Sequence, residues 1–309
     1  MHAGGCRAAG ERVVLVGPAL RRDFRLPAMN APSFLQLPIR LRHDAPGFFE
    51  GLASLGLLYL RARNPTAELV VMGDSGEAAL TSAERVLFPS LGLALAPSRL
   101  AGVHASRTAW LPQNPGLLEF DFEQARFPLG IAIADEPEGI ARLQNFVARF
   151  CREEVELPQL LEWRAALAEP FKSCPCCQAA AIERRAHPEA HPLSPILSDV
   201  IDSGADLHCR VRGEGFDLSR FIDARWISFE GGITVHGGPG ESILRIDPAH
   251  AHAVWVLPVR VDGETRTTVR IYDTLGNMNL ELSVPGGSFV APWQRYCAAG
   301  SSPSSDAAD

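Results

Sequence analysis

The run of strand-like segments between Arg225 and Pro285 constrains the fold more than any other part of this chain. Segments rich in Val, Ile, Thr and aromatic residues alternate there with turns that contain Gly, Asn, Asp or Pro. Such segments suit a pleated, half-buried surface, and Gly and Asn supply the positive φ that tight turns need. Five or six of the segments are expected to form one antiparallel sheet. Residues 254–272, with Asp262-Gly263 as their turn, predict a β-hairpin.

Length and charge limit the class of protein. The 309 residues suffice for two domains, each with its own core. A formal net charge of −7 argues against a general nucleic-acid surface and against an anionic membrane as partner. No apolar run approaches the roughly 20 residues that span a bilayer. The N-terminus lacks the apolar segment of a signal peptide, so the sequence predicts a cytoplasmic protein.

The two halves of the chain look like copies of one unit. Three pairs of segments match, and one of them aligns Pro97 with Pro248. The matched segments are 93–103 with 244–254 and 118–131 with 269–282, both 151 positions apart, and 58–62 with 207–211, 149 positions apart. Because nearly one spacing serves separate segments, the sequence predicts a duplication. The predicted division is a first repeat at 34–172, a connection at 173–195 rich in Cys and His, and a second repeat at 196–297.

The second half resembles a known family. The motifs that carry the resemblance are Ile233-Thr-Val-His236-Gly-Gly, Ile246-Asp-Pro, Ala253-Val-Trp-Val, Asp262-Gly and Val269-Arg-Ile-Tyr-Asp-Thr-Leu-Gly. They are similar to the second repeat of the bacterial haem-utilisation proteins of the HemS/ChuX type. Leu55-Gly56 and residues 117–122 and 146–150 give the first half a weaker likeness to the same family.

The resemblance implies both a fold and a function. The implied fold class is α+β, with two tandem repeats that each contain a large antiparallel β-sheet and flanking helices. The implied function is haem binding in the cytoplasm, for haem trafficking or use of haem iron, with a haem-delivery or acceptor protein as partner. Haem would lie in a cleft between a sheet face and a helix. The residues do not decide between a carrier and a haem-degrading enzyme.

Candidate ligands for haem iron lie mainly in the connection. Haem iron needs an axial imidazole or thiolate, and its propionates accept hydrogen bonds from arginine or lysine. In two-repeat members of the family, the axial histidine precedes an aromatic pair near the start of the second repeat. The matching connection here has no aromatic pair, whereas a similar His-Asp-Ala-Pro-Gly-Phe-Phe begins at His43, ahead of the first repeat. The candidates are therefore His187, His191, Cys174 and His43, each of which could instead be an exposed linker or turn residue.

The same connection allows a different interpretation. Cys174-x2-Cys177-x9-His187-x3-His191 has the pairs of thiols and imidazoles that close tetrahedral zinc sites. The gap of nine is shorter than the roughly 12–15 residues usual in zinc fingers. The alternative to haem binding is thus a non-enzymatic, two-domain interaction or regulatory protein with structural zinc. A reactive thiol cluster is a third interpretation.

The other histidines are expected to have packing roles. His250-Ala-His252 places two imidazoles on one face of a strand, because strand side chains alternate between faces. A metal or a haem edge could use both, but a solvated strand face explains them equally. His104, His208 and His236 fall in expected strands, where core or surface packing is the default.

Overall fold

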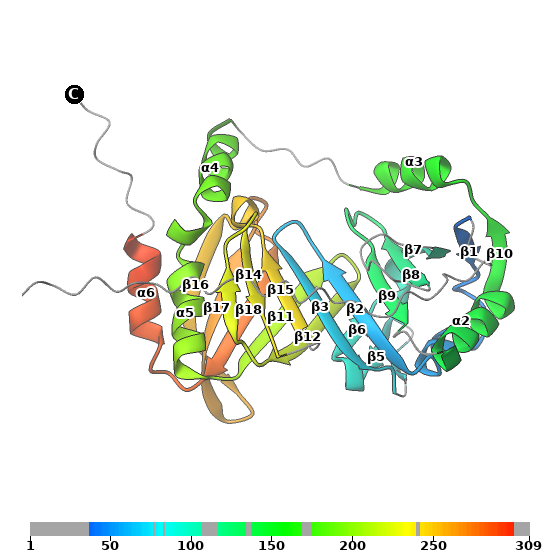
Figure 1. Ribbon diagram of the computed structural model, residues 1–309, viewed down its shortest axis with the longest axis horizontal. Helices are drawn as coiled ribbons and strands as arrows, with labels where there is room; N and C mark the ends of the chain where they lie inside the picture. Colours follow the sequence, from blue (N-terminus) through cyan, green and yellow to red (C-terminus); the bar gives the residue numbers. More distant parts are fainter. Residues whose placement is uncertain are drawn as a thin grey trace, which may run out of the picture.

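The structure is a computed structural model. It describes residues 37–76, 78–82, 84–106, 116–133, 137–168, 175–238 and 242–299. The helices are α1 (Phe48–Ala53), α2 (Pro137–Phe150), α3 (Leu157–Leu167), α4 (Pro175–Ala186), α5 (Leu193–Ser203) and α6 (Val290–Ala299) (Figure 1). Short 3₁₀ helices are η2 (Pro89–Leu91), η3 (Pro97–Arg99), η4 (Pro188–Ala190) and η5 (Pro248–His250). None of the described helices is long and apolar enough to cross a membrane.

The strands form two large antiparallel sheets, which confirms the α+β class. The ten-stranded sheet runs in the order β10 (Cys151–Glu154), β1 (Ile39–Leu41), β7 (Leu100–Ser106), β8 (Leu117–Phe122), β9 (Leu129–Ile133), β2 (Leu57–Arg63), β3 (Ala67–Asp74), β15 (Ser242–Ile246), β14 (Ile233–His236), β13 (Trp226–Ser228). The eight-stranded sheet runs in the order β16 (Ala253–Val261), β17 (Glu264–Tyr272), β18 (Met278–Pro285), β11 (Leu207–Gly213), β12 (Phe216–Ile222), β6 (Leu93–Leu95), β5 (Arg85–Phe88), β4 (Ala79–Ser82).

Each half lends three strands to the other half's sheet. β4, β5 and β6 extend the eight-stranded sheet, and β13, β14 and β15 extend the ten-stranded one. The single sheet expected for 225–285 is therefore wrong, because 226–246 and 253–285 lie in different sheets. In the ten-stranded sheet the two halves meet where β15 pairs with β3. Leu244 lies opposite Leu69 there, and both are fully buried. Strand-forming residues show that a strand exists, but its partner is chosen by tertiary packing.

The pairing registers follow the two sequence spacings. In the first half Leu60 pairs with Ile131, and in the second half Cys209 pairs with Leu282. Leu60 and Cys209 are 149 positions apart, whereas Ile131 and Leu282 are 151 apart. All four side chains are buried. Residues matched in sequence thus occupy matching places in the two sheets. The boundaries of the predicted division stay a prediction.

Helices cover one face of each sheet, here called the inner face, which carries Leu60 and Leu282. Phe48 of α1 packs its ring against those of Phe146 and Phe150 of α2, each 5.2 Å away between centroids. α5 and α6 take the same place in the second half (Figure 1). The opposite, outer face carries the residues that alternate with the inner ones along each strand, and in the first half α3 packs against it.

The predicted hairpin is confirmed. β16 and β17 pair over their full lengths, from Ala253 with Tyr272 to Val261 with Glu264. Asp262 and Gly263 both have positive φ, at 50° and 84°, as a tight hairpin turn requires.

Candidate functional site

The connection between the halves forms a helix that arginines attach to the second half. Arg184 of α4 donates through Nε to the Pro248 carbonyl at 2.9 Å and through a terminal nitrogen to the Ala249 carbonyl at 3.0 Å. Arg185 pairs with Asp247 at 2.6 Å. No α4 side chain is buried. α4 is therefore held at η5, just before β16, by polar contacts rather than by a core (Figure 1).

His191 is a buried imidazole with its hydrogen bonds made inside the protein. It ends η4 and is 5% exposed. Its Nδ1 lies 3.3 Å from the backbone nitrogen of Leu193, and its ring also hydrogen-bonds to the backbone of Ala251. Burial, helped by the charge of Arg184, lowers the pKa of His191 to about 4, so the ring is neutral at pH 7. In this fold His191 joins the connection to the segment that precedes β16.

His187 is the exposed histidine of the connection. Its side chain is 67% exposed, and its Nδ1 lies 3.4 Å from a carboxylate oxygen of Glu189. Cys176 is exposed and Cys177 half-buried on α4, while Cys174 lies outside the described residues. Within the described ranges, no three His, Cys, Asp or Glu side chains converge as metal ligands would. The described residues therefore give the zinc interpretation no support.

A groove of about 560 Å³ runs beside η4 and α5 toward α6. Its lining includes Glu189, Pro192, Pro195, Phe229 and Tyr296. The Tyr296 hydroxyl hydrogen-bonds to Asp199, whose charge raises the pKa of Tyr296. The volume is within the range of small-molecule sites, and the lining combines apolar residues with Ser194, Ser198 and Glu189. His187 is not part of the lining, but it contacts the lining residue Glu189.

His43 occupies the matching place in the first half. The buried Phe48 of α1 follows His43 by five residues, and the buried Ile196 of α5 follows His191 by five. His43 is half-buried, and this burial lowers its pKa, with Asp44 acting in the opposite direction. The structure thus places His43 in the first half, whereas His187 and His191 flank η4 in the connection. It does not bring the three into one site.

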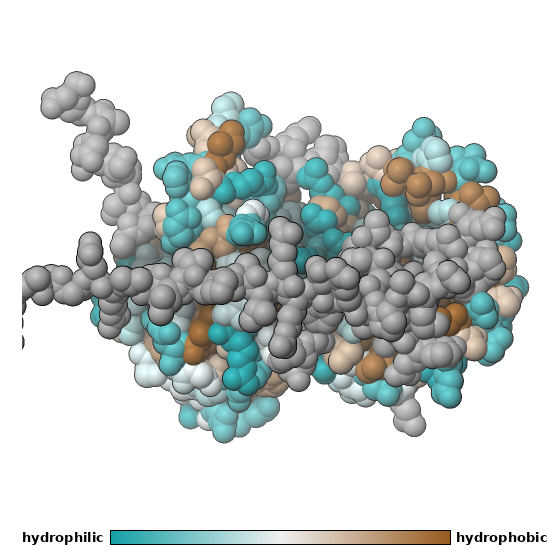
Figure 2. All heavy atoms as spheres, viewed as in Figure 1, coloured by the Kyte–Doolittle hydropathy of each residue, from teal (hydrophilic) through white to brown (hydrophobic). Residues whose placement is uncertain are grey.

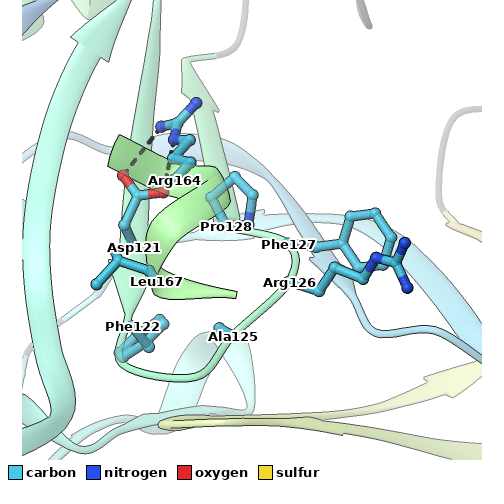
Figure 3. A pocket seen from close by; sticks show the side chains of 8 residues that line it. All are labelled: Asp121, Phe122, Ala125, Arg126, Phe127, Pro128, Arg164 and Leu167. Atoms are coloured by element: carbon cyan, nitrogen blue, oxygen red, sulfur yellow. Dashed lines mark hydrogen bonds and ion pairs between the residues drawn. The ribbon is translucent and has the colours of Figure 1, made fainter. Parts of the chain in front are cut away.

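A buried charge cluster covers the outer face of the first half. Arg164 of α3 donates to Asp121 at 2.7 Å (Figure 3). It also donates to Glu119 at 3.1 Å, and His104 Nδ1 lies 2.9 Å from Asp121. Trp163 packs edge-on against His104, with 5.3 Å between ring centroids. The hollow beside Asp121 and Arg164 measures only about 10 Å³, which is too small for a ligand beyond a single water molecule.

The matching outer face of the second half carries exposed side chains among the described residues. The outer-face positions 151 residues after this cluster hold Trp255, Arg270 and Tyr272. Trp255 pairs with Arg270 across β16 and β17, as His104 pairs with Glu119 across β7 and β8. Trp255 is nevertheless 63% exposed, whereas His104 is 2% exposed. The same strand arrangement therefore has a buried outer face in the first half at His104 and an exposed one in the second half at Trp255.

The outer faces of both halves carry an arginine motif that the apolar sequence matches do not reveal. The pattern Arg-x-Arg-x4-acid occurs as Arg61, Arg63, Glu68 and again, 149 positions later, as Arg210, Arg212, Asp217. The first arginine of each set pairs with the acid, at 2.7 Å in the first half and 2.6 Å in the second. A search for repeated charges, in addition to apolar matches, could have found it.

Comparison with known proteins identifies the fold. No protein-family model and no curated protein sequence matches the chain. Solved structures match over nearly its whole length. The heme-degrading enzyme ChuS of Escherichia coli O157:H7 matches with a TM-score of 0.63 and 14% identity, over 85% of this chain and 87% of that one. Apo-PhuS, a heme-binding protein from Pseudomonas aeruginosa, matches with a TM-score of 0.59 and 13% identity, over 85% and 87% of the two chains. The predicted resemblance to the HemS/ChuX type is confirmed at the level of the fold.

Proposed function

We propose that the protein binds haem in the groove between α5 and α6 and acts in haem trafficking or in the use of haem iron. The fold is shared with proteins described as heme-degrading and heme-binding. The observation that carries the proposal is the exposed imidazole of His187, in contact with a lining residue of a groove of ligand size. We further propose the cytoplasm as its location and a haem-delivery or acceptor protein as its partner.

The groove has the chemistry that haem needs. A porphyrin is flat and apolar, and Phe229 and Tyr296 offer aromatic contact for it. The contact of Nδ1 with Glu189 would orient the His187 ring and leave Nε2 for the iron. Arg295 is exposed on α6, interacts electrostatically with the lining residue Tyr296, and would offer a cation to a propionate.

The other candidate ligands remain proposals that need more rearrangement. His191 is neutral and so ready to bind a metal, but it would first have to break its contacts with Leu193 and Ala251. Cys174 lies three residues before Cys177 and could provide a thiolate. His43 would require a second site in the first half.

A hemin titration that records the Soret band tests the proposal. We expect a saturable shift of the band, and loss of the imidazole-ligated spectrum in His187→Ala. His252→Ala is the matched control, because His252 is also exposed but bonds through its backbone to Tyr272, outside the groove lining, whereas His187 contacts the lining residue Glu189. A titration indistinguishable from free hemin would exclude haem binding. An unchanged spectrum in His187→Ala would move the ligand elsewhere, to be located with His191→Ala, Cys174→Ala and His43→Ala.

A further inference from the structure

One buried carboxylate on the outer face of the ten-stranded sheet is shared by three arginines. Glu68 of β3 is 8% exposed. Its carboxylate pairs with Arg61 at 2.7 Å, with Arg63 at 3.8 Å and with Arg245 at 2.6 Å. Burial alone would raise the pKa of Glu68, but the hydrogen bonds from Arg61 and Arg245 lower it below its usual value, so the carboxylate is charged. One negative charge therefore faces three positive ones.

The second half lacks the third of these arginines. Glu68 pairs across the strands with Arg245 of β15, a strand that the second half lends to this sheet. The matching acid of the second half, Asp217, pairs with Ala94 of β6, a strand lent in the other direction. Ala94 and Arg245 are 151 positions apart and occupy matching places. Arg245 is thus a cation beyond the two that the shared arginine motif supplies.

The next carboxylate does not balance the excess charge. Asp247 lies close enough to act on the charge of Arg63. It already pairs with Arg185 of α4 at 2.6 Å and accepts a hydrogen bond from the Ala249 backbone at 3.0 Å. With this pair included, four arginines face two carboxylates among the described residues. Like charges in excess repel one another, and a bound anion would relieve that repulsion.

Two of the arginines are open to a ligand. The side chain of Arg245 is 55% exposed and that of Arg63 is 43% exposed. Arg63 also lies over the Phe127 ring, 4.1 Å from its centroid, and this contact helps to hold the guanidinium plane. Thr234 of β14 pairs across the strands with Arg245 and adds a half-buried hydroxyl to the same face. A guanidinium has five N–H donors, so contact with Glu68 leaves others for the oxygens of a ligand.

We propose that Arg63 and Arg245 form a binding site for an oxyanion, the phosphate or carboxylate group of a ligand, on the outer face of the ten-stranded sheet. Guanidinium groups match the paired oxygens of both kinds of group. The shared carboxylate of Glu68 holds the two arginines together before the ligand arrives. Neither arginine lines the groove proposed for haem, so this site adds a second ligand class to the protein.

Calorimetric titrations of the full chain with pyrophosphate and with citrate, in a buffer free of other oxyanions, test the proposal. We expect saturable binding of at least one of the two, and the tighter binder shows whether the site prefers phosphate or carboxylate. Arg245→Gln and Arg63→Gln should each weaken that binding by about tenfold or more, because each removes charge-assisted hydrogen bonds. Added sodium chloride should weaken it as well.

The matched control is Arg225→Gln, which removes an arginine that is 63% exposed just before β13 of the same sheet. Anion affinity should not change in that variant. Arg61 still pairs with Glu68 in both test variants, and thermal melting checks that they fold. The proposal is overturned if neither anion binds saturably, or if Arg245→Gln and Arg63→Gln bind as tightly as the unchanged protein. A hemin titration of Arg245→Gln should match that of the unchanged protein, and a lost Soret response would assign this arginine to haem instead.

Discussion

The two halves share one strand order and one register, yet they use the same outer face in opposite ways. In the first half, the buried Asp121 and the half-buried Glu119 both pair with Arg164 of α3. In the second half, Arg270 and Tyr272 stand at the matching positions beside the exposed Trp255. The surface at the place of α3 carries hydrophobic side chains, drawn in brown in Figure 2. Leu157 and Leu161 of this helix are both exposed. One strand arrangement can therefore carry a buried outer face in one half and an exposed outer face in the other.

The largest expected effect comes from opening the closed face. Arg164→Ala would leave the buried Asp121 and the half-buried Glu119 without this cation, which should lower the free energy of unfolding by about 3–5 kcal/mol. Arg270→Ala, the matched change on the open face, should cost at most about 1 kcal/mol, because that pair is partly exposed. Urea unfolding of both variants measures the difference. Equal losses would contradict the contrast between the faces.

The next effect compares the two histidines that precede α1 and α5. Because the pKa of His191 is about 4 when folded and near 6.5 when unfolded, the unfolded chain binds more protons between these values. Its contribution is complete above pH 6.5 and is lost as the pH falls toward 4, a difference of roughly 3 kcal/mol. His191→Gln should remove that part of the pH dependence in urea titrations from pH 7 to pH 4. His43→Gln should remove less, since His43 is only half-buried.

A smaller effect separates the two tryptophans on the outer faces. Trp163→Ala should cost about 2 kcal/mol, below the range for fully buried aromatics, because Trp163 is half-buried against His104. Trp255→Ala should change stability by less than about 0.5 kcal/mol, since it is 63% exposed. Thermal unfolding of the two variants side by side gives the comparison. A large loss in Trp255→Ala would mean that its face is already covered.

Local patterns predicted much of the fold. The turn at Asp262-Gly263 and the strands on either side followed from the chemistry of positive φ and β-branched residues. The spacing of 151 matched residues that do share a place in the two sheets, such as Val103 and Val254. The exchange of strands between the sheets could not be predicted, because it depends on the burial of Leu69 against Leu244, a contact between distant segments.

The candidate site was less accessible to sequence reasoning. The spacing in the connection identified the two histidines but not that one is buried and the other exposed. His191 hydrogen-bonds to Leu193 and Ala251, and the second of these contacts joins segments far apart in sequence. His104 was expected to pack in a strand, and it does, but its contacts with Asp121 and Trp163 join segments far apart in sequence. No periodicity within one segment carries that information.

The smallest expected difference concerns the arginine motif that the two halves share. Arg61→Ala and Arg210→Ala each remove one arginine from an acid that keeps another cation nearby, Arg245 at 2.6 Å from Glu68 in the first half and Arg212 at 3.3 Å from Asp217 in the second. Each variant should therefore lose only about 1 kcal/mol of unfolding free energy. Because each acid keeps a cation, the two losses should agree within about 0.5 kcal/mol in urea unfolding. A larger disagreement would show that the surroundings of the two arginine–acid pairs differ between the sheets.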